Sequence, residues 1–554
     1  MLGLTTLDVA ALAAYFLAVG AIGLISARRV HTLGDYLMGG RRFGKTYMVM
    51  HTFSTGTQTD HAVAVVGASY ELGLAGIWYQ WLWLFTTPFY WLIAPVFRRM
   101  RYLTMGDFFA HRYGRSLEAF YASTCVLVLM LQMGLMLQGT ARTIEGLTGG
   151  RLPMGECVIA MAVVLAVYSF AGGLIAAIRT DAFQGLLIIF FSFLPLPFVV
   201  EHVGGLAELR RQVGPQMFSL VAPREVTFFY VVMVTVNALV GVPIRPHQMA
   251  LGGAGRTEME ARIGLTYGGF LKRLCTLGWA IAGLYAAALC PGLTHRELAL
   301  GELTRSVLPA GLVGLALAAF LAGSMSTCDS VTVAGSGLLT QNLYRKFVAP
   351  NRSDRHYLLV GRLSGLAFLG GGVVLAFSFP TVVSMMEALW RVTGFLGIAF
   401  WGGLLWPRAN CKGAWAGVLA AAGLALVLQI KGEQNLATQI ALYLPTGFLA
   451  LIIVSLLTAP EPRKKIEDFY ATLSVPIGQE YQLEKANVAV VYSGYSEKTG
   501  DRSRLVLVDL ALRRAISWSS HRVDLAGFLL AWGIALTFLL LAWAIAFVAE
   551  TGLM

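Results

Sequence analysis

The chain has 554 residues, of which 57% are hydrophobic and 13% are charged, and its formal net charge is +12. Soluble globular proteins carry about 25% charged residues, so this composition excludes a water-soluble protein built around a single core. The positive charge does not indicate a nucleic-acid partner, because the Lys and Arg residues gather in loops that are predicted to lie on one side of a membrane.

Apolar stretches long enough to cross a hydrocarbon layer of ~30 Å begin near Leu7 and recur about fourteen times along the chain. We therefore predict an all-α polytopic membrane protein with about fourteen transmembrane helices in a lipid bilayer. No Lys or Arg precedes the first stretch, whereas several follow it directly: Arg28, Arg29, Arg41, Arg42 and Lys45. This asymmetry predicts an outside N-terminus. An even number of spans returns the C-terminus to the same side of the plasma membrane.

Two of these stretches are interrupted. Residues 51–61 are mostly polar at mid-membrane depth, which a bilayer tolerates only where the segment lines protein or water. Residues 237–247 carry residues that break a helix or cost energy in lipid, namely Gly241, Pro243, Arg245 and Pro246. Two broken spans at corresponding positions of two five-span halves are typical of an inverted-repeat transporter with its binding site between the halves. The alternative is a pair of kinked helices that pack through small residues.

These breaks and the loops suggest an organisation in six segments. In chain order we predict a leading transmembrane helix and inner loop over 1–46, a first inverted repeat over 47–200, an outer loop and second inverted repeat over 201–406, trailing helices over 407–460, a cytoplasmic insert over 461–524 and a last transmembrane helix over 525–554. The insert contains two runs that resemble β-strands, 489–492 and 505–508. It is too short for a catalytic domain.

A cluster of hydroxyl groups lies in the ninth apolar stretch, between residues 317 and 332. Spacings of three and four residues place its small and polar members on one helical face: Gly323, Ser326, Thr327, Asp329 and Ser330. Hydroxyl and carbonyl oxygens are the ligands that a hard cation such as sodium prefers. Lone Ser and Thr residues in membrane helices usually bond back to the preceding turn, and that alternative applies here as well.

Several motifs resemble the sodium/solute symporter family, which includes sodium-coupled carriers of proline, sugars and sialic acid. They are Gly34-Asp-Tyr-Leu-Met-Gly-Gly-Arg41, Tyr70-Glu-Leu-Gly-Leu74, Tyr168-Ser-Phe-Ala-Gly-Gly-Leu174 with Thr180-Asp181, and Ser324-Met-Ser-Thr327 through Asn342-Leu-Tyr344. The resemblance covers about Asp8 to Trp406. It implies a ten-helix inverted-repeat core with one leading and three trailing helices, and alternating access driven by sodium.

The resemblance also implies two ion sites. The shared sodium site would use the carbonyl oxygens of Ser54, Thr57 and Gly323 and the hydroxyls of Ser326 and Thr327. Some members hold a second sodium, for which Asp181, Ser326, Asp329 and Ser330 occupy the matching positions. Because Asp329 stands where a hydroxyl is more usual, this second site is either a stronger sodium site or a proton-linked one.

The solute is expected beside the breaks. The candidate residues that could contact it are Gly56, His61, Gln80, Asn237, Lys272, Trp390 and Arg391. Two of the three positions that bind sugar hydroxyls in related sugar carriers differ in type here, which weakens the case for a sugar.

Three intramembrane guanidinium groups bear on the charge of the solute. Arg142, Arg245 and Arg391 are costly in lipid unless paired, and such residues often bind a carboxylate. Glu145, Asp60 and Glu387 could instead pair with them structurally. The sequence leaves both an anionic and a neutral polar solute open.

The leading hypothesis is a sodium-coupled importer of a small polar solute, and two others compete with it. A membrane sensor that binds solute without net transport is the main alternative, because some family relatives signal through attached kinase domains. An enzyme is not expected, since no metalloprotease or serine-hydrolase motif occurs. ATP is not expected either. Residues 39–46 fit the phosphate-loop pattern, but they precede a membrane span without the buried strand that such a loop requires.

Overall fold

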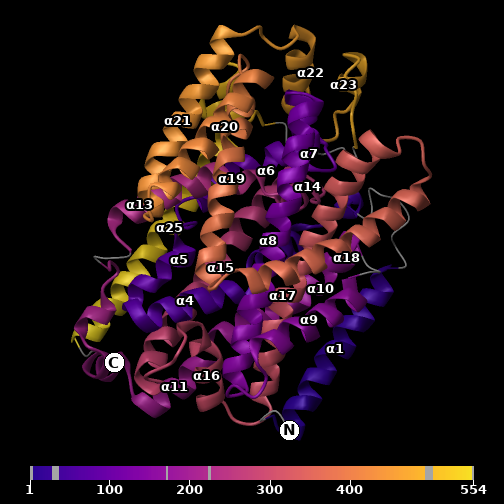
Figure 1. Ribbon diagram of the computed structural model, residues 1–554. Helices are drawn as coiled ribbons and strands as arrows, with labels where there is room; N and C mark the ends of the chain where they lie inside the picture. The colour runs from indigo at the N-terminus through magenta and orange to yellow at the C-terminus, as the bar shows by residue number, and fades with distance from the viewer. Residues whose placement is uncertain are drawn as a thin grey trace.

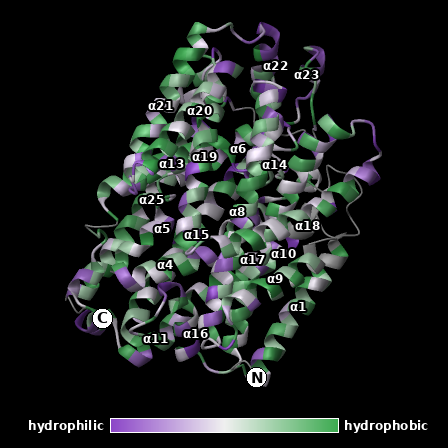
Figure 2. Ribbon diagram, viewed as in Figure 1, coloured by the Kyte–Doolittle hydropathy of each residue, from purple (hydrophilic) through white to green (hydrophobic). Residues whose placement is uncertain are grey.

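A computed structural model describes residues 4–27, 37–169, 173–222, 226–492, 494 and 503–551. In these residues the chain is helical and contains no β-strand beyond isolated bridges. The helices pack into one elongated bundle (Figure 1). Apolar residues cover most of its length, and strongly hydrophilic stretches lie around α22 and α23 and towards the opposite end (Figure 2).

The first half of the described chain forms α1 (Thr6–Ala27), η1 (Gly39–Arg41), α3 (Lys45–Gly56), α4 (Thr59–Leu72), η2 (Gly73–Ile77), α5 (Trp78–Trp81), α6 (Thr87–Met100), α7 (Met105–Arg112), α8 (Arg115–Leu147), α9 (Met154–Ser169), α10 (Gly173–Phe193), α11 (Pro195–Val203), α12 (Leu206–Val213) and η3 (Pro215–Phe218). The second half forms α13 (Phe228–Gly241), η4 (Val242–Ile244), α14 (Gln248–Gly253), α15 (Glu258–Leu289), η5 (Arg296–Leu298), α16 (Ala299–Val307), α17 (Leu312–Gly337), η6 (Leu338–Val348), α18 (Asp354–Ser378), α19 (Val382–Leu405), α20 (Cys411–Ile430), α21 (Leu436–Leu457), α22 (Arg463–Ser474), α23 (Tyr481–Lys485), α24 (Val506–Ala511) and α25 (Trp518–Thr551).

Nine helical segments among the described residues are long and apolar enough to cross a membrane. This number is lower than the fourteen predicted spans because some spans are interrupted or carry several charges. α3 ends after 12 residues, and α15 carries charged residues along its length, including Glu258, Lys272 and Arg273. The count of fourteen and the inverted repeat stay predictions.

Both predicted interruptions are present. α3 ends at Gly56 and α4 begins at Thr59, and Thr57 between them has φ −118° and ψ 86°, outside the helical region. α13 ends at Gly241 and passes through the 3-10 turn that contains Pro243 into extended backbone at Arg245, before α14 begins. At both places helical hydrogen bonding stops inside the bundle, which frees backbone groups for other partners.

Glycines bring α15 close to both halves of the first broken helix. A β-carbon at Gly264 would come within 2.6 Å of the Met48 Cβ on α3, and one at Gly283 would come within 2.6 Å of the Val66 carbonyl oxygen on α4. Glycine is therefore required for this close approach, as is usual where membrane helices cross. α15 thus carries its polar residues directly past the break.

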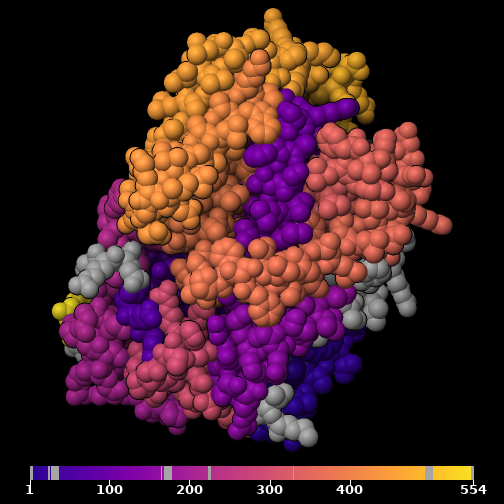
Figure 3. Space-filling view, viewed as in Figure 1, coloured from indigo at the N-terminus to yellow at the C-terminus, as the bar shows by residue number. Residues whose placement is uncertain are grey.

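α18 covers α8 on the face shown in Figure 3, where the orange helix crosses in front of the purple one. A β-carbon at Gly134 of α8 would lie 2.9 Å from the Gly372 carbonyl oxygen of α18, so small residues again allow the crossing. Because α18 lies outside it, α8 is an inner helix whose polar residues can line the interior.

The insert between α21 and α25 forms three short helices, α22 to α24. The prediction of strands in this segment is wrong: residues 489–492 have no regular structure, and Val506–Ala511 is a helix. The Asp524 carboxylate accepts a hydrogen bond from the Val506 amide at 2.8 Å and thereby caps this helix. The two runs also lack a partner strand, and a lone strand leaves its backbone groups unpaired.

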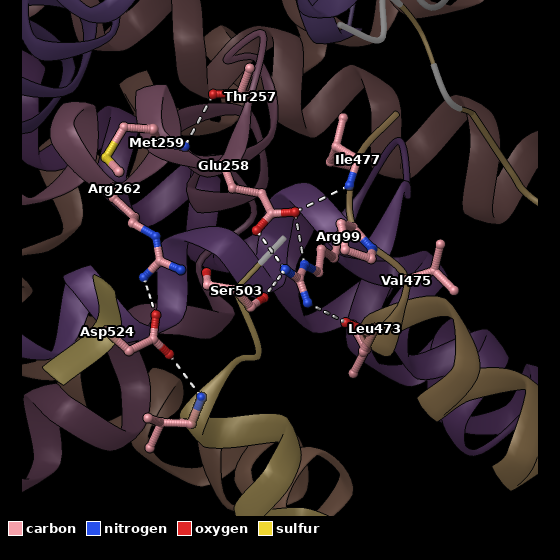
Figure 4. Close-up of polar contacts among 12 residues, drawn as sticks. Arg99, Thr257, Glu258, Met259, Arg262, Leu473, Val475, Ile477, Ser503 and Asp524 are labelled. Carbon is pink, nitrogen blue, oxygen red and sulfur yellow. Dashed lines mark hydrogen bonds and ion pairs between the residues drawn. The ribbon is translucent and has the colours of Figure 1, made fainter. Parts of the chain in front are cut away.

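Buried charged residues at the ends of α6 and α15 bond to the insert (Figure 4). Glu258 of α15 pairs with Arg99 at 2.8 Å and accepts the Ile477 amide at 3.1 Å, while Arg99 also donates to the Ser503 carbonyl at 2.7 Å. Burial acts to raise the pKa of Glu480, but the Arg101 guanidinium and nearby backbone amides outweigh burial and lower this pKa below its ordinary value. The insert is therefore fixed to the bundle by charged groups.

Candidate functional site

The hydroxyl cluster of α17 faces the first break. The Thr327 hydroxyl donates to the Thr55 carbonyl at 2.8 Å, in the last turn of α3. A β-carbon at Gly323 would lie 3.4 Å from the Thr57 carbonyl oxygen, so α17 passes the break in close contact. These oxygens lie fully inside the protein, since Thr55, Ser326 and Thr327 are each at most 1% exposed.

A buried carboxylate joins this cluster from α10. Asp181 accepts a hydrogen bond from the Ser326 hydroxyl and a second one, at 3.2 Å, from the Thr55 hydroxyl. His51 Nδ1 lies 2.6 Å from Asp181 Oδ2, and the Thr55 and Ser330 hydroxyl oxygens are 3.1 Å apart. Three helices, α3, α10 and α17, thus bring an acid, an imidazole and three hydroxyls together.

The structure places most of the predicted ion-site residues at this junction. Gly323, Ser326 and Thr327 lie against the break, and Asp181 and Ser330 lie beside them. The Ser54 carbonyl accepts the Thr57 amide at 3.1 Å, whereas the Thr55 carbonyl accepts the hydrogen bond from Thr327 of α17. The Asp329 side chain lies outside the described part of the structure.

A cavity lies between the two broken helices. The residues lining it come from both breaks and from α5, α6, α8 and α15, and include Thr52, Thr55, Gly56, Gln58, His61, Gln80, Trp83, Tyr90, Gln132, Arg245, His247, Gln248, Lys272 and Arg273. Thr55 belongs both to this cavity and to the hydroxyl cluster. A molecule bound in the cavity would therefore be adjacent to the residues predicted to bind the ion.

Four of the predicted solute contacts meet in this cavity: Gly56, His61, Gln80 and Lys272. Lys272 donates to the Gly56 carbonyl, and its Nζ lies 2.8 Å from His61 Nδ1. The Gln80 side chain is fully buried, and neither its amide oxygen nor its amide nitrogen has a hydrogen-bond partner in the described structure. Such a group is positioned to bond a ligand.

The other three predicted contacts lie outside this cavity lining. Asn237 donates to the Trp390 carbonyl at 3.0 Å and accepts from the Tyr443 hydroxyl at 2.7 Å, so its amide is satisfied within the protein. Arg391 donates to Gln439 at 3.0 Å and lies 3.5 Å from Glu387. Trp390 packs edge-on against Trp83 of the cavity, with ring centroids 5.1 Å apart.

The arginines differ in their pairing. Arg142 lies 2.9 Å from Glu145 and 3.9 Å from Glu297, and Arg391 is paired as described above. The guanidinium of Arg245 has no salt bridge or hydrogen bond to a described residue. Its Nε is buried without a partner, while the residue as a whole is partly exposed. The proposed pair between Arg245 and Asp60 is therefore not formed.

Comparison with known proteins identifies the family. The sequence model that represents the sodium:solute symporter family matches residues 36–421, which is more than half of the chain. The chain belongs to the sodium:solute symporter family. Its members are transporters and not enzymes, and their transport is coupled to sodium.

Two similar members of the family are curated transporters from bacteria. The sodium/pantothenate symporter of Escherichia coli (strain K12) is 26% identical over 451 residues, covering 77% of this chain and 91% of the relative. The osmoregulated proline transporter OpuE of Bacillus subtilis (strain 168) is 26% identical over 469 residues, covering 80% and 93%.

The chain described here shares its fold with a solved structure. A sodium-coupled sialic acid symporter, described in a substrate-bound outward-open state with a novel sodium site, aligns with a TM-score of 0.73 at 18% identity, covering 82% of this chain and 99% of that one. At this identity the similarity concerns the fold alone.

Sequence reasoning missed several residues of the site. His51 begins the polar segment of the second span, but its pairing with Asp181 depends on a contact across 130 positions of sequence. Gln132 is an isolated polar residue in a long apolar stretch, which was a usable signal, since such residues face the interior in membrane proteins. Arg273 and His247 likewise line the cavity.

Proposed function

We propose that the protein is a secondary active symporter of the plasma membrane that imports a small polar organic solute together with sodium by alternating access. The observation that carries this proposal is the polar cavity between the two helix breaks, which shares Thr55 with the hydroxyl cluster of α17. Broken helices supply carbonyl oxygens and helix ends at the binding site of such transporters.

In this proposal sodium binds where α17 meets the first break. Ser54, Thr57 and Gly323 contribute carbonyl oxygens, and Ser326 and Thr327 contribute hydroxyls. The Thr55 carbonyl, which contacts the Thr327 hydroxyl at 2.8 Å, supports placing the ion at this junction. A second sodium would be held by Asp181, Asp329 and Ser330. The solute would bind beside the first ion, so that occupancy of one site favours occupancy of the other.

The coupling has a sufficient driving force. One charge that crosses 100 mV contributes about 2.3 kcal/mol, and a tenfold sodium gradient adds about 1.4 kcal/mol. A single sodium ion would therefore concentrate a neutral solute several hundredfold. The relatives described above are transporters, and the sensor alternative gains no support from them.

The test removes the hydroxyl ligands. Replacing Ser326 and Thr327 together with Ala is expected to abolish the stabilisation of the purified protein by sodium relative to potassium, and to abolish sodium-driven uptake into proteoliposomes. Ser336→Ala is the matched control, because Ser336 is a buried serine of the same helix whose hydroxyl bonds to the Val333 carbonyl at 3.0 Å.

Uptake is measured with pantothenate, proline, glucose and sialic acid under a sodium, a potassium or a proton gradient. Sodium dependence that survives in the double variant would refute the assigned ion site. Solute binding without net uptake under any gradient would refute transport itself.

A further inference from the structure

We propose that the cavity between the two helix breaks binds an organic anion, and that Arg245 holds the carboxylate of this anion. This inference rests on the proposed function, because it names the class of solute that the symporter carries. It also assigns a role to a residue that belongs to neither proposed ion site.

Arg245 is a charged group in the bundle without a partner. It lies in extended backbone between η4 and α14, at the second break, where the helix is interrupted. Its guanidinium makes no hydrogen bond or salt bridge to a described residue, and Nε is fully buried. The residue is partly exposed and lines the cavity, so the guanidinium can be reached by a bound ligand. A planar carboxylate is the ligand that matches its fork of donors.

The cavity lining as a whole carries positive charge, as Arg245 does. Lys272 and Arg273 of α15 join Arg245, and no carboxylate occurs among the lining residues. Arg273 Nη1 donates to the Gln80 carbonyl at 2.9 Å, which satisfies a hydrogen bond but leaves the charge unbalanced. Asp60 lies nearby, with Oδ2 3.7 Å from His61 Nε2, and it offsets one of the three positive charges. An anionic ligand would balance the remainder.

The paired arginines of the same bundle support this argument. Arg142 and Arg391 have carboxylates within 4.0 Å on their own helices, Glu145 and Glu387. Each of these two guanidinium groups thus has a carboxylate one helical turn away. Arg245, which lines the cavity, is left for a ligand.

Neutral polar groups of the cavity lining indicate which other groups the solute carries. The Gln80 amide, the Gln132 carbonyl oxygen and His247 Nδ1 are buried without hydrogen-bond partners, and all three residues line the cavity. They offer both donors and acceptors. We infer a carboxylate that also carries hydroxyl or amide groups. A neutral sugar would satisfy the amides but would leave Arg245 unpaired.

The test compares anions with their neutral analogues. The purified protein in sodium chloride is given three pairs: pantothenate and its alcohol panthenol, sialic acid and its methyl ester, and glucuronate and glucose. Binding is measured as thermal stabilisation and as a change in tryptophan fluorescence, because Trp83 lines the cavity. At least one carboxylate is expected to bind about 10- to 100-fold more tightly than its neutral partner, as one charge-assisted contact allows.

Variants of Arg245 test whether this residue causes the preference for the carboxylate. Arg245→Gln is expected to bring the affinity for the carboxylate down to that for the neutral analogue, while Arg245→Lys keeps the preference for the anion at lower affinity. Arg142→Gln is the control, because Arg142 is an intramembrane arginine that has its own carboxylates. It is expected to retain the preference of the wild type.

Three outcomes would overturn the inference: equal binding of a carboxylate and its neutral analogue, no binding of any carboxylate in the set, or an unchanged preference in Arg245→Gln. Stabilisation by sodium alone is measured for each variant as well. A variant that is still stabilised by sodium retains the proposed ion site, so a failed anion test then counts against the anionic solute and not against sodium coupling. Sodium-driven uptake of glucose by the wild type would leave symport intact and refute the anionic solute.

Discussion

Arg99 and Glu258 form an ion pair that is almost entirely withdrawn from water, with side chains 1% and 0% exposed. Two Arg99 nitrogens each lie 2.8 Å from a carboxylate oxygen, so the contact is bidentate. Glu258 also accepts the Ile477 amide from the insert. Removing one member of such a pair leaves the other charged and buried, and that desolvation cost is larger than the net value of the pair.

Glu258→Gln is therefore expected to lower the free energy of unfolding by about 3–5 kcal/mol, measured by thermal or denaturant unfolding in detergent. Glu467→Gln is the control, because its pair with Arg463 is exposed, with side chains 60% and 93% accessible, and exposed pairs contribute about 0–1 kcal/mol. Equal unfolding of the two variants would contradict this account of the insert's attachment.

At the scale of helices, small residues decide which elements meet. α20 and α21 approach through glycines: a β-carbon at Gly417 would lie 2.9 Å from the Gly447 carbonyl oxygen and 3.0 Å from the Leu451 Cβ. In lipid there is no hydrophobic driving force between helices, so close packing of this kind supplies much of their association. The same feature holds α15 against the first broken helix.

Gly417→Leu is expected to force α20 away from α21 and to destabilise the protein by about 1–3 kcal/mol, as overpacking does. The matched control is Gly423→Leu on the same helix, where no atom lies within 4 Å of a β-carbon. Thermal unfolding and the monodisperse fraction on size exclusion measure both variants. The packing argument is refuted if the control loses as much stability as Gly417→Leu.

For the whole molecule, the two ends of the bundle differ in content. α1 begins and α25 ends at one end, and the insert helices α22 and α23 lie at the other (Figure 1). Arginines from α6, α7 and the turn between these helices gather with the insert, where Arg98, Arg99, Arg101 and Arg112 are buried. The positive-inside rule therefore predicts that the insert faces the cytoplasm and that both termini face outwards.

Cysteine labelling checks this orientation. Cys290 and Cys411, the two native cysteines that are not fully buried, are replaced by Ser, and a single cysteine is introduced as Thr6→Cys or Gln482→Cys, both at exposed positions. A membrane-impermeant maleimide is expected to label Thr6→Cys in intact cells, and Gln482→Cys only after permeabilisation. Labelling of both from outside would contradict the predicted topology.

The sequence by itself determined the membrane class, the two helix breaks and the family, because each depends on local composition or on short motifs. It also supplied correct partners for Arg142 and Arg391, since Glu145 and Glu387 lie three and four positions away, one helical turn along the same helix.

Only the tertiary structure decided which distant residues meet. His51 and Asp181 are 130 positions apart, Thr55 and Thr327 are 272 apart, and no spacing rule relates residues on different helices. For the same reason the unpaired state of Arg245 could not be predicted. A charge inside the bundle is free or neutralised according to which helices pack beside it, and that packing is a property of the assembled bundle.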